Sequence, residues 1–240
     1  VEFVGVVTGF TDYSTEYSNY DKVFVEDSTG AIVVYRAAFP ADLKIGDKFL
    51  IVGKLGQYNG LIQIAQGATV TLIDSDNDLI LPVEVTNVAE INEDFQAKRI
   101  DLEGTVVSVS ANGQTMVVKV GENEITVRSN SSSNAHIVNA HLLTAVIGQE
   151  VNLNGIHVDW FNGAQLLPTT VEQIVFVELS DEMKVADAKA NLIVPSIVAT
   201  EEISLPTEGL HGTVITWASS NETIIATDGT VVLPTEETEV

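Results

Sequence analysis

A stretch that sets the fold occurs twice in this chain. The first copy reads Ile45-Gly46-Asp47-Lys48-Phe49-Leu50-Ile51-Val52-Gly53 and is followed by Gln57-Tyr58-Asn59-Gly60-Leu61-Ile62-Gln63. The second copy reads Ile147-Gly148-Gln149-Glu150-Val151-Asn152-Leu153-Asn154-Gly155 and is followed by Trp160-Phe161-Asn162-Gly163-Ala164-Gln165. Each copy joins an alternating apolar segment, typical of a half-buried strand, to an Asn-Gly turn. The two copies begin at Ile45 and Ile147, a spacing of about 100 residues. This spacing is too long for a solenoid repeat and indicates a duplicated small domain.

The first copy lies in a unit predicted over residues 1–79. β-Branched, alternating segments separated by Gly, Asp and Asn predict strands at 4–10, 22–27, 31–36, 47–55 and 61–73. Residues 40–43 form a crossover between the third and fourth strands. Five strands with a crossover at this place have the order of an OB-fold, a partly open Greek-key barrel.

The second copy lies in a unit predicted over residues 80–178 with the same plan. The strands are expected at 99–110, 115–120, 124–128, 151–158 and 165–177, with a tight turn at Asn112-Gly113. The Ser- and Asn-rich segment 130–134 caps a helix expected at 135–146, at the crossover position. Asp74 to Asp78 is the expected linker between the units.

Residues 179–240 have a different character. Ser180 caps a helix that carries acids in its first turn and runs to about Leu192. Pro195 ends this helix, and strands are expected at 202–205, 213–217 and 228–231. These strands are too few to close a β-sandwich.

This last segment resembles the bacterial immunoglobulin-like modules of secreted and cell-wall proteins. The matching residues are Met183 to Lys189, Ile203 to Thr207, Gly212 to Asn221 and Asp228 to Val231. The resemblance implies a core position for Trp217 and a truncated module joined to further domains of the same parent chain.

The two barrels resemble OB-fold accessory domains of bacterial secreted nucleases and related surface proteins. The residues behind this are Val4 to Val7, Val25 to Tyr35, Leu43 to Asp47 and Tyr58 to Gln63. The second unit departs from the pattern, because Asn112 to Glu124 replaces the acidic turn that ends at Gly30. The expected fold is therefore all-β: two five-stranded OB-fold barrels in tandem, followed by a partial immunoglobulin-like β-sandwich led by a short helix. The resemblance implies binding of nucleic acid or another ligand, although an OB-fold alone does not dictate one.

Composition narrows the functional classes. The chain has 11 basic and 34 acidic residues, a net charge of −23 that repels polyanions at long range. It lacks the basic stripe of proteins that bind nucleic acid chiefly through phosphates. The absence of Cys excludes disulfides, thiolate nucleophiles and Cys-type zinc sites, and favours an exported protein. No apolar run is long enough to span a membrane. We expect an extracellular or cell-surface bacterial protein without membrane insertion.

Aromatic side chains in the loops are the candidate ligand contacts. Three of the tyrosines lie in the long first loop, residues 11–21, and Tyr58 lies in the loop between strands four and five. These two loops rim the usual binding face of an OB-fold, where planar rings stack on bases or sugars. The candidates are the five tyrosines, three nearby basic residues and the aromatic pair of the second unit: Tyr13, Tyr17, Tyr20, Tyr35 and Tyr58; Lys22, Arg36 and Lys54; Trp160 and Phe161. The Trp-Phe pair is either an exposed tip that contacts a partner or a turn that hides both rings under the barrel.

The sequence predicts no catalytic residue, metal site or cofactor. Asp74, Asp76 and Asp78 alternate like the start of a calcium loop, but the later ligand positions do not follow, so a solvated linker is expected. The alternative is a calcium ion that nearby oxygens help to bind. His136 and His141 do not share one helix face. The predicted function is a non-catalytic region that recruits single-stranded nucleic acid. The alternative is an adhesion or spacer module that binds polysaccharide or protein.

Overall fold

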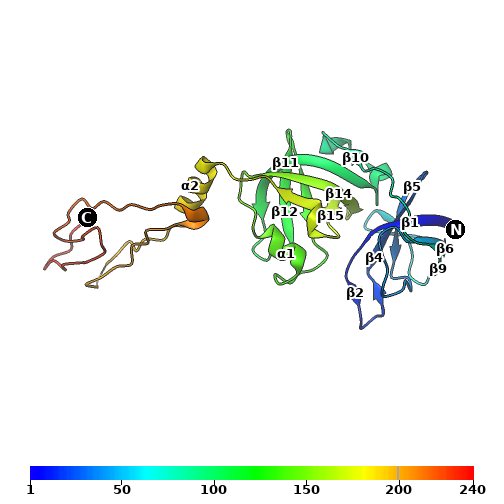
Figure 1. The fold of residues 1–240 in the computed structure, drawn as a ribbon, viewed down its shortest axis with the longest axis horizontal. Coiled ribbons are helices and arrows are strands. Elements are labelled where there is room, and N and C mark those ends of the chain that lie inside the picture. Colours follow the sequence, from blue (N-terminus) through cyan, green and yellow to red (C-terminus); the bar gives the residue numbers. More distant parts are fainter. Residues whose placement is uncertain (199) are drawn as a thin grey trace. The chain divides into compact units, whose positions relative to one another are not determined.

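The computed structural model of the protein describes residues 1–198 and 200–240. The chain divides into two compact units, Val1–Val177 and Glu178–Val240. Unit 1 contains two barrels with separate sheets (Figure 1). Barrel 1 comprises the strands from β1 to β9, and barrel 2 those from β10 to β16. The expected all-β fold with two OB-fold barrels is confirmed.

Barrel 1 is a ring of five strands, two of which are interrupted. Its strands are β1 (Glu2–Phe10), β4 (Lys22–Asp27), β5 (Gly30–Tyr35), β6 (Lys48–Val52), β7 (Leu55–Tyr58), β8 (Leu61–Ile64) and β9 (Thr69–Asp74), with a small hairpin of β2 (Tyr13–Ser14) and β3 (Asn19–Tyr20). β1 pairs with β4 and β6, and β5 runs parallel to β8. The antiparallel pairs β6–β9 and β7–β8 close the ring. This is the OB order, with β6–β7 as the fourth strand and β8–β9 as the fifth.

Barrel 2 repeats this plan. Its strands are β10 (Val83–Glu84), β11 (Arg99–Val109), β12 (Thr115–Val120), β13 (Asn123–Arg128), β14 (Glu150–Trp160), β15 (Ala164–Leu167) and β16 (Ile174–Phe176). β11 pairs with both β12 and β14, and β13 runs parallel to β15, so the ring closes. Short 3-10 helices lie at Val88–Glu90, Glu93–Phe95 and Val171–Gln173.

The crossovers of the two barrels differ. In barrel 2 the predicted helix is present as α1 (Ile137–Leu142), shorter than expected, and it buries Val138 and Leu142 against the core. In barrel 1 the segment from Pro40 to Leu43 stays non-helical and places Leu43 in the core. Each barrel therefore has a hydrophobic core of its own, filled by the inward-facing residues of its strands.

Barrel 2 packs on the outer face of β4 and β5. Phe24 and Val33 from these strands form a small buried cluster with Ala97 and Leu167 of barrel 2. The ring of Phe24 lies 4.2 Å from the imidazole of His157, between centroids. These two strands are strands two and three of the OB-fold, whose outer face usually binds the ligand. In barrel 1 the centre of that face is covered by the neighbouring barrel.

Gly9 on β1 makes this close approach feasible. A Cβ built on Gly9 would lie 2.4 Å from Cε1 of His157 and 2.8 Å from Oγ1 of Thr169. We expect Gly9→Ala to lower the free energy of unfolding of unit 1 by about 1–3 kcal/mol, because overpacking forces the barrels apart. Gly30→Ala is the control in urea unfolding, since a Cβ at Gly30 meets no atom within 4 Å. Equal losses in the two variants would contradict this account.

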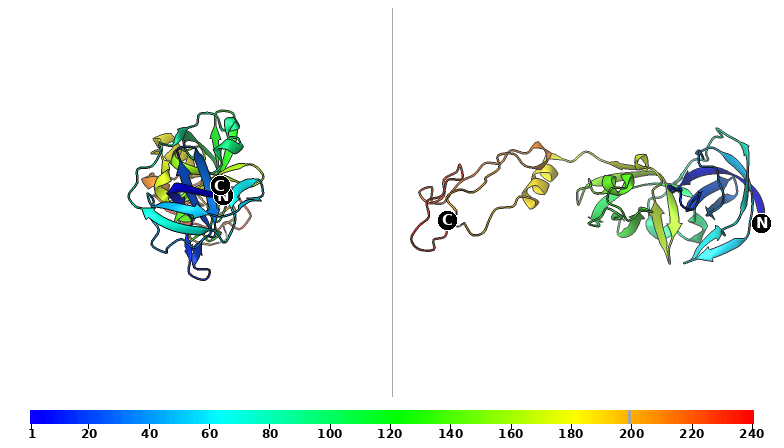
Figure 2. Two further views of the ribbon diagram at one scale, coloured as in Figure 1. Left: turned by 90° about the vertical axis from the view of Figure 1, so that its right-hand side faces the viewer. Right: turned by 90° about the horizontal axis from the view of Figure 1, so that it is seen from below.

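Unit 2 begins with the helix α2 (Asp181–Ala190), drawn in yellow in Figure 2. The Ser180 hydroxyl caps it by accepting a hydrogen bond from the backbone N–H of Met183, as its sequence predicts. The strands expected at 202–205, 213–217 and 228–231 are not formed among the described residues. They are reduced to three isolated bridges: Glu202–Thr230, Glu208–Val214 and Ile225–Val231. The Trp217 indole N–H donates to the Pro206 carbonyl at 2.8 Å, a structural contact. A 3-10 helix lies at Leu210–Gly212.

Candidate ligand site between the two barrels

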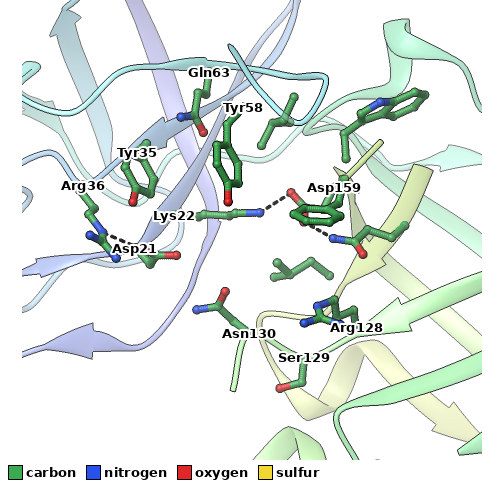
Figure 3. Close-up of a pocket in the computed structure, with 15 residues that line it drawn as sticks. Asp21, Lys22, Tyr35, Arg36, Tyr58, Gln63, Arg128, Ser129, Asn130 and Asp159 are labelled. Carbon is green, nitrogen blue, oxygen red and sulfur yellow. Dashed lines mark hydrogen bonds and ion pairs between the residues drawn. The ribbon is translucent and has the colours of Figure 1, made fainter. Parts of the chain in front are cut away.

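A pocket of about 370 Å³ opens where the rim of barrel 1 meets barrel 2 (Figure 3). Its volume lies within the range of about 300–1,000 Å³ that ligand pockets usually have. Both barrels supply its walls, with side chains of mixed charge, amides and aromatic rings. The lining residues are Asp21, Lys22, Tyr35, Arg36, Tyr58, Leu61 and Gln63 from barrel 1, and Arg128, Ser129, Asn130, Asp159, Trp160, Phe161, Gln165 and Leu167 from barrel 2.

The two Asn-Gly turns of the sequence repeat meet beside this pocket. The backbone N–H of Asn162 donates to the carbonyl of Asn59 at 2.6 Å. Gly60 has a φ of +88°, and a Cβ there would lie 2.8 Å from the indole of Trp160. Only glycine fits such a left-handed turn under a large ring. The duplicated turn therefore serves as a contact between the two barrels.

The turns carry two exposed aromatic rings to the edge of the pocket. Tyr58 is 61% exposed and Phe161 is 55% exposed. Their ring centroids are 6.3 Å apart, with the planes inclined at 62°. Trp160 is half-buried and packs against the inter-barrel cluster. The predicted Trp-Phe pair is thus divided: Phe161 is an exposed tip, whereas Trp160 packs under the turn of barrel 1.

A fixed guanidinium lies on the barrel 1 side of the pocket. Nε of Arg36 donates to Oδ1 of Asp21 at 2.8 Å, and this hydrogen bond raises the pKa of Arg36 above its ordinary value. The guanidinium carbon lies 5.0 Å from the ring centre of Tyr35 and 5.6 Å from that of Tyr17. Cation–π contacts of this length hold the side chain in place. Tyr17 reaches this position from the turn between β2 and β3, whose ribbon extends away from barrel 1 in Figure 1.

An ion pair between the barrels lies in the pocket wall. Nζ of Lys22 is 2.5 Å from Oδ1 of Asp159, and the side chains are 16% and 2% exposed. Nε2 of Gln165 donates to the other carboxylate oxygen at 2.7 Å. Dashed lines in Figure 3 mark these contacts. Both oxygens of the buried carboxylate therefore have partners, as a buried charge requires.

A second polar group is buried deeper between the barrels. Oγ1 of Thr8 lies 3.1 Å from Nε2 of His157, a fully buried residue. Burial, with a smaller contribution from the charge of Arg99, lowers the pKa of His157 to about 3. Arg99 also pairs with Glu26 at 3.5 Å and donates to the Ile80 carbonyl. Burial raises the pKa of Glu26 despite this neighbouring cation.

The pocket is locally cationic although the chain is strongly acidic. Its lining contains three basic residues, Lys22, Arg36 and Arg128, and two acidic ones, Asp21 and Asp159. The chain as a whole has 34 acidic and 11 basic residues. An anionic ligand that is repelled by the net charge of the chain would meet a lining with one excess positive charge here.

Six of the ten predicted site residues line this pocket: Lys22, Tyr35, Arg36, Tyr58, Trp160 and Phe161. Tyr17 contacts it through Arg36. Tyr20 instead belongs to the core of barrel 1, where it is 3% exposed and its hydroxyl donates to the Ala41 carbonyl. Tyr13 packs edge-on against Tyr20, and Lys54 is exposed outside the pocket lining. These three are therefore not pocket residues.

Sequence reasoning missed the amides and Arg128. Gln63 and Gln165 follow the Asn-Gly turn in each copy of the repeat, so their shared position was a signal from which they could have been predicted. Arg128 and Asn130 carried no local signal, because their place in the pocket depends on how the barrels dock. Among the described residues, no group of three His, Cys, Asp or Glu side chains could hold a metal ion. No helix in the described part of the chain is long and apolar enough to cross a membrane.

Comparison with known proteins bears on each unit separately. Residues 185–239 match the family described as atrophied bacterial Ig domain, which accords with the isolated bridges of unit 2. A comparison with curated proteins finds no match.

Similar solved structures include three nucleic-acid complexes. A murine DNA-binding protein with double-stranded DNA is 8% identical, with a TM-score of 0.40, and the match covers 75% of this chain and 98% of that one. Fission yeast Pot1 with single-stranded DNA is 11% identical, with a TM-score of 0.33 and coverage of 81% and 88%. A replication protein A heterotrimer with single-stranded DNA is 12% identical, with a TM-score of 0.32 and coverage of 80% and 53%. At this level of similarity the ligands of those proteins say nothing about the ligand of this chain.

Proposed function

We propose that the pocket between the barrels binds single-stranded nucleic acid, within a non-catalytic region of a secreted or surface-anchored bacterial protein. The observation that carries this is the pair of exposed rings, Tyr58 and Phe161, at the edge of a pocket whose lining is net cationic. Unstacked bases bind such rings at a gain of about 1–3 kcal/mol per base. Stacking supplies most of the affinity, because the charge of the whole chain opposes phosphate binding.

The state of the pocket carboxylates supports a binding role rather than catalysis. Asp21 is held by Arg36 at 2.8 Å, and Asp159 by Lys22 at 2.5 Å. A general acid or base needs a carboxyl group that is free to exchange a proton with the substrate. Both carboxylates of the pocket are engaged in ion pairs, so the geometry favours a site that holds its ligand unchanged.

Two observations support an exported, surface-associated protein. Residues 185–239 match a bacterial immunoglobulin-like family. The chain contains no Cys, which suits a low-cysteine secreted proteome. Detection of the parent protein in the culture medium or cell-wall fraction would test this placement, and detection confined to the cytoplasm would contradict it.

A polysaccharide is the second candidate ligand, because amide side chains line the pocket beside the rings. Gln63, Gln165 and Asn130 offer donors and acceptors of the kind that sugar hydroxyls use. Salt separates the candidates, since binding of a neutral glycan does not weaken when phosphate screening increases. Binding of neutral glycans with no binding of oligonucleotides would replace the first proposal with the second.

We expect Tyr58→Ala and Phe161→Ala each to weaken binding of a short oligothymidylate by about 5- to 150-fold, the equivalent of one lost stack. Fluorescence anisotropy at low salt measures this. Leu72→Ala is the control, because Leu72 is 52% exposed on β9 and does not line the pocket. If oligonucleotides do not bind at low salt, or if both ring variants bind like the control, the proposed function is wrong.

A further inference from the structure

Two arginines from different barrels line opposite sides of this pocket. Arg36 follows β5 of barrel 1, and Arg128 ends β13 of barrel 2. In Figure 3 Tyr58 and Lys22 lie between them, with Arg36 on one side and Arg128 on the other. A ligand that stacks at the centre of the pocket would therefore have one arginine on each flank.

The terminal N–H groups of Arg36 are placed to bind an oxyanion. Its Nε is occupied by Asp21, while none of the hydrogen bonds found in the described part of the chain involves its terminal nitrogens. The side chain is 37% exposed, and the two tyrosine rings contact its guanidinium at 5.0 and 5.6 Å. A planar guanidinium held this way presents its free N–H groups as a fork, the geometry that phosphate oxygens accept.

The positive charge of Arg128 has no acidic partner among the described residues. It is exposed, and within residues 1–198 and 200–240 it takes part in no ion pair. The next two residues, Ser129 and Asn130, line the pocket beside it. Lys22 and Arg36 both have an acidic partner, but the side chain of Lys22 is only 16% exposed and its ammonium is bound to a buried carboxylate, whereas Arg36 is 37% exposed and keeps its terminal nitrogens free of hydrogen bonds within the described residues. The cations available to a ligand are thus the two on the flanks.

We propose that the pocket takes one nucleotide with a phosphate on each side, the first against Arg36 and the second against Arg128, with the base stacked on the ring of Tyr58 and in edge contact with that of Phe161. This inference rests on the proposed function and adds the number and place of the phosphate contacts. A neutral ligand would cover both guanidinium groups without replacing their water, which costs free energy. Two consecutive phosphates of a single strand restore those contacts.

The salt dependence of binding counts these phosphates. Each phosphate neutralised on a single strand contributes about −0.7 to the slope of log K against log salt. We expect a slope of about −1.4 for the unaltered chain, so a fourfold rise in salt weakens oligothymidylate binding about sevenfold. Arg36→Gln and Arg128→Gln should each reduce this loss to about two- to threefold, and the double variant should abolish it.

Matched variants keep the test specific. Lys54→Gln removes an exposed charge outside the pocket and should leave the slope unchanged. Arg36→Lys retains the charge but loses the fork and the ring contacts, so it should keep the slope while binding more weakly. A thymidine nucleotide with both 5′ and 3′ phosphates should bind better than the nucleoside in the unaltered chain, and equally weakly in the double variant.

The outcomes separate this inference from the proposed function. Oligonucleotide binding that needs Tyr58 and Phe161 but has the same salt slope in the arginine variants would overturn the two-phosphate arrangement and leave the proposed function standing. A near-zero slope of log K against log salt in the unaltered chain would also overturn the two-phosphate arrangement and leave the proposed function standing. Absence of oligonucleotide binding, or binding indifferent to both rings, would overturn the proposed function and the inference with it.

Discussion

Replacing Asp159 by alanine is expected to lower the free energy of unfolding of unit 1 by about 3–5 kcal/mol, as removal of one member of a buried ion pair usually does. The Asp159 side chain is 2% exposed and that of Lys22 is 16% exposed. Without the carboxylate, the ammonium of Lys22 and the amide of Gln165 both lose their partner between the barrels. Both groups line the pocket, so water there replaces only part of the contact that the buried carboxylate provided.

Urea unfolding of the complete chain measures this loss, with two variants for comparison. Asp12→Ala removes an exposed partner of His136, since Asp12 is 77% exposed, and should cost less than about 1 kcal/mol. The double variant Lys22→Met, Asp159→Leu removes both charges and should recover most of the loss. A loss in Asp159→Ala no larger than in Asp12→Ala would show that the pair does not hold the barrels together.

The barrels could be predicted because their signals are local. Alternation along segments such as Thr115 to Val120 depends on which side chains face the core, and β12 has those bounds in the structure. The Asn-Gly turns at Asn59 and Asn162 both adopt positive φ, as their residue types indicate. Because the two units repeat each other, the strand order predicted for one unit also predicts the strand order of the other.

The missed parts depend on contacts between distant segments. In unit 2 the segment around Val214 has strand composition, yet Val214 is 81% exposed and forms only an isolated bridge. β-Propensity stabilises a strand only when neighbours cover it. The same reason explains why Tyr20 was wrongly predicted to contact a ligand. Its sequence context is typical of a loop, but its ring packs on that of Phe10, with 5.0 Å between the centroids. Pattern alone does not distinguish an exposed ring from a ring that folds back on its barrel.

Docking of the barrels determines the site more than any loop does. Barrel 2 covers the outer face of β4 and β5 with Ala97 and Leu167, so the predicted binding face is reduced to its rim. Arg128 enters the pocket only through that docking. Gly9 is a local indication of this docking, because a glycine within a β-branched strand often marks the close approach of another element.

His157 should make unit 1 lose stability in mild acid. Its pKa is lowered to about 3 in the folded chain, first by burial and then by Arg99. An unfolded histidine has a pKa of about 6.5. Below that pH the histidine is protonated in the unfolded chain but stays neutral in the folded chain. The free energy of unfolding therefore falls by about 1.4 kcal/mol per pH unit until the pKa of the folded chain is reached. The contribution is present above about pH 6.5 and is lost as the pH falls toward 3.

His157→Gln tests this, because the amide can still reach the hydroxyl of Thr8 but does not titrate. Between about pH 7 and pH 4 the unaltered chain should lose about 3 kcal/mol more than the variant in urea unfolding. Glu26, whose pKa is raised, favours the folded state as the pH falls, and it is present in both proteins. The difference between the two curves therefore reports His157. Parallel curves would mean that the imidazole takes up its proton in the folded chain at its ordinary pKa, which would contradict this account.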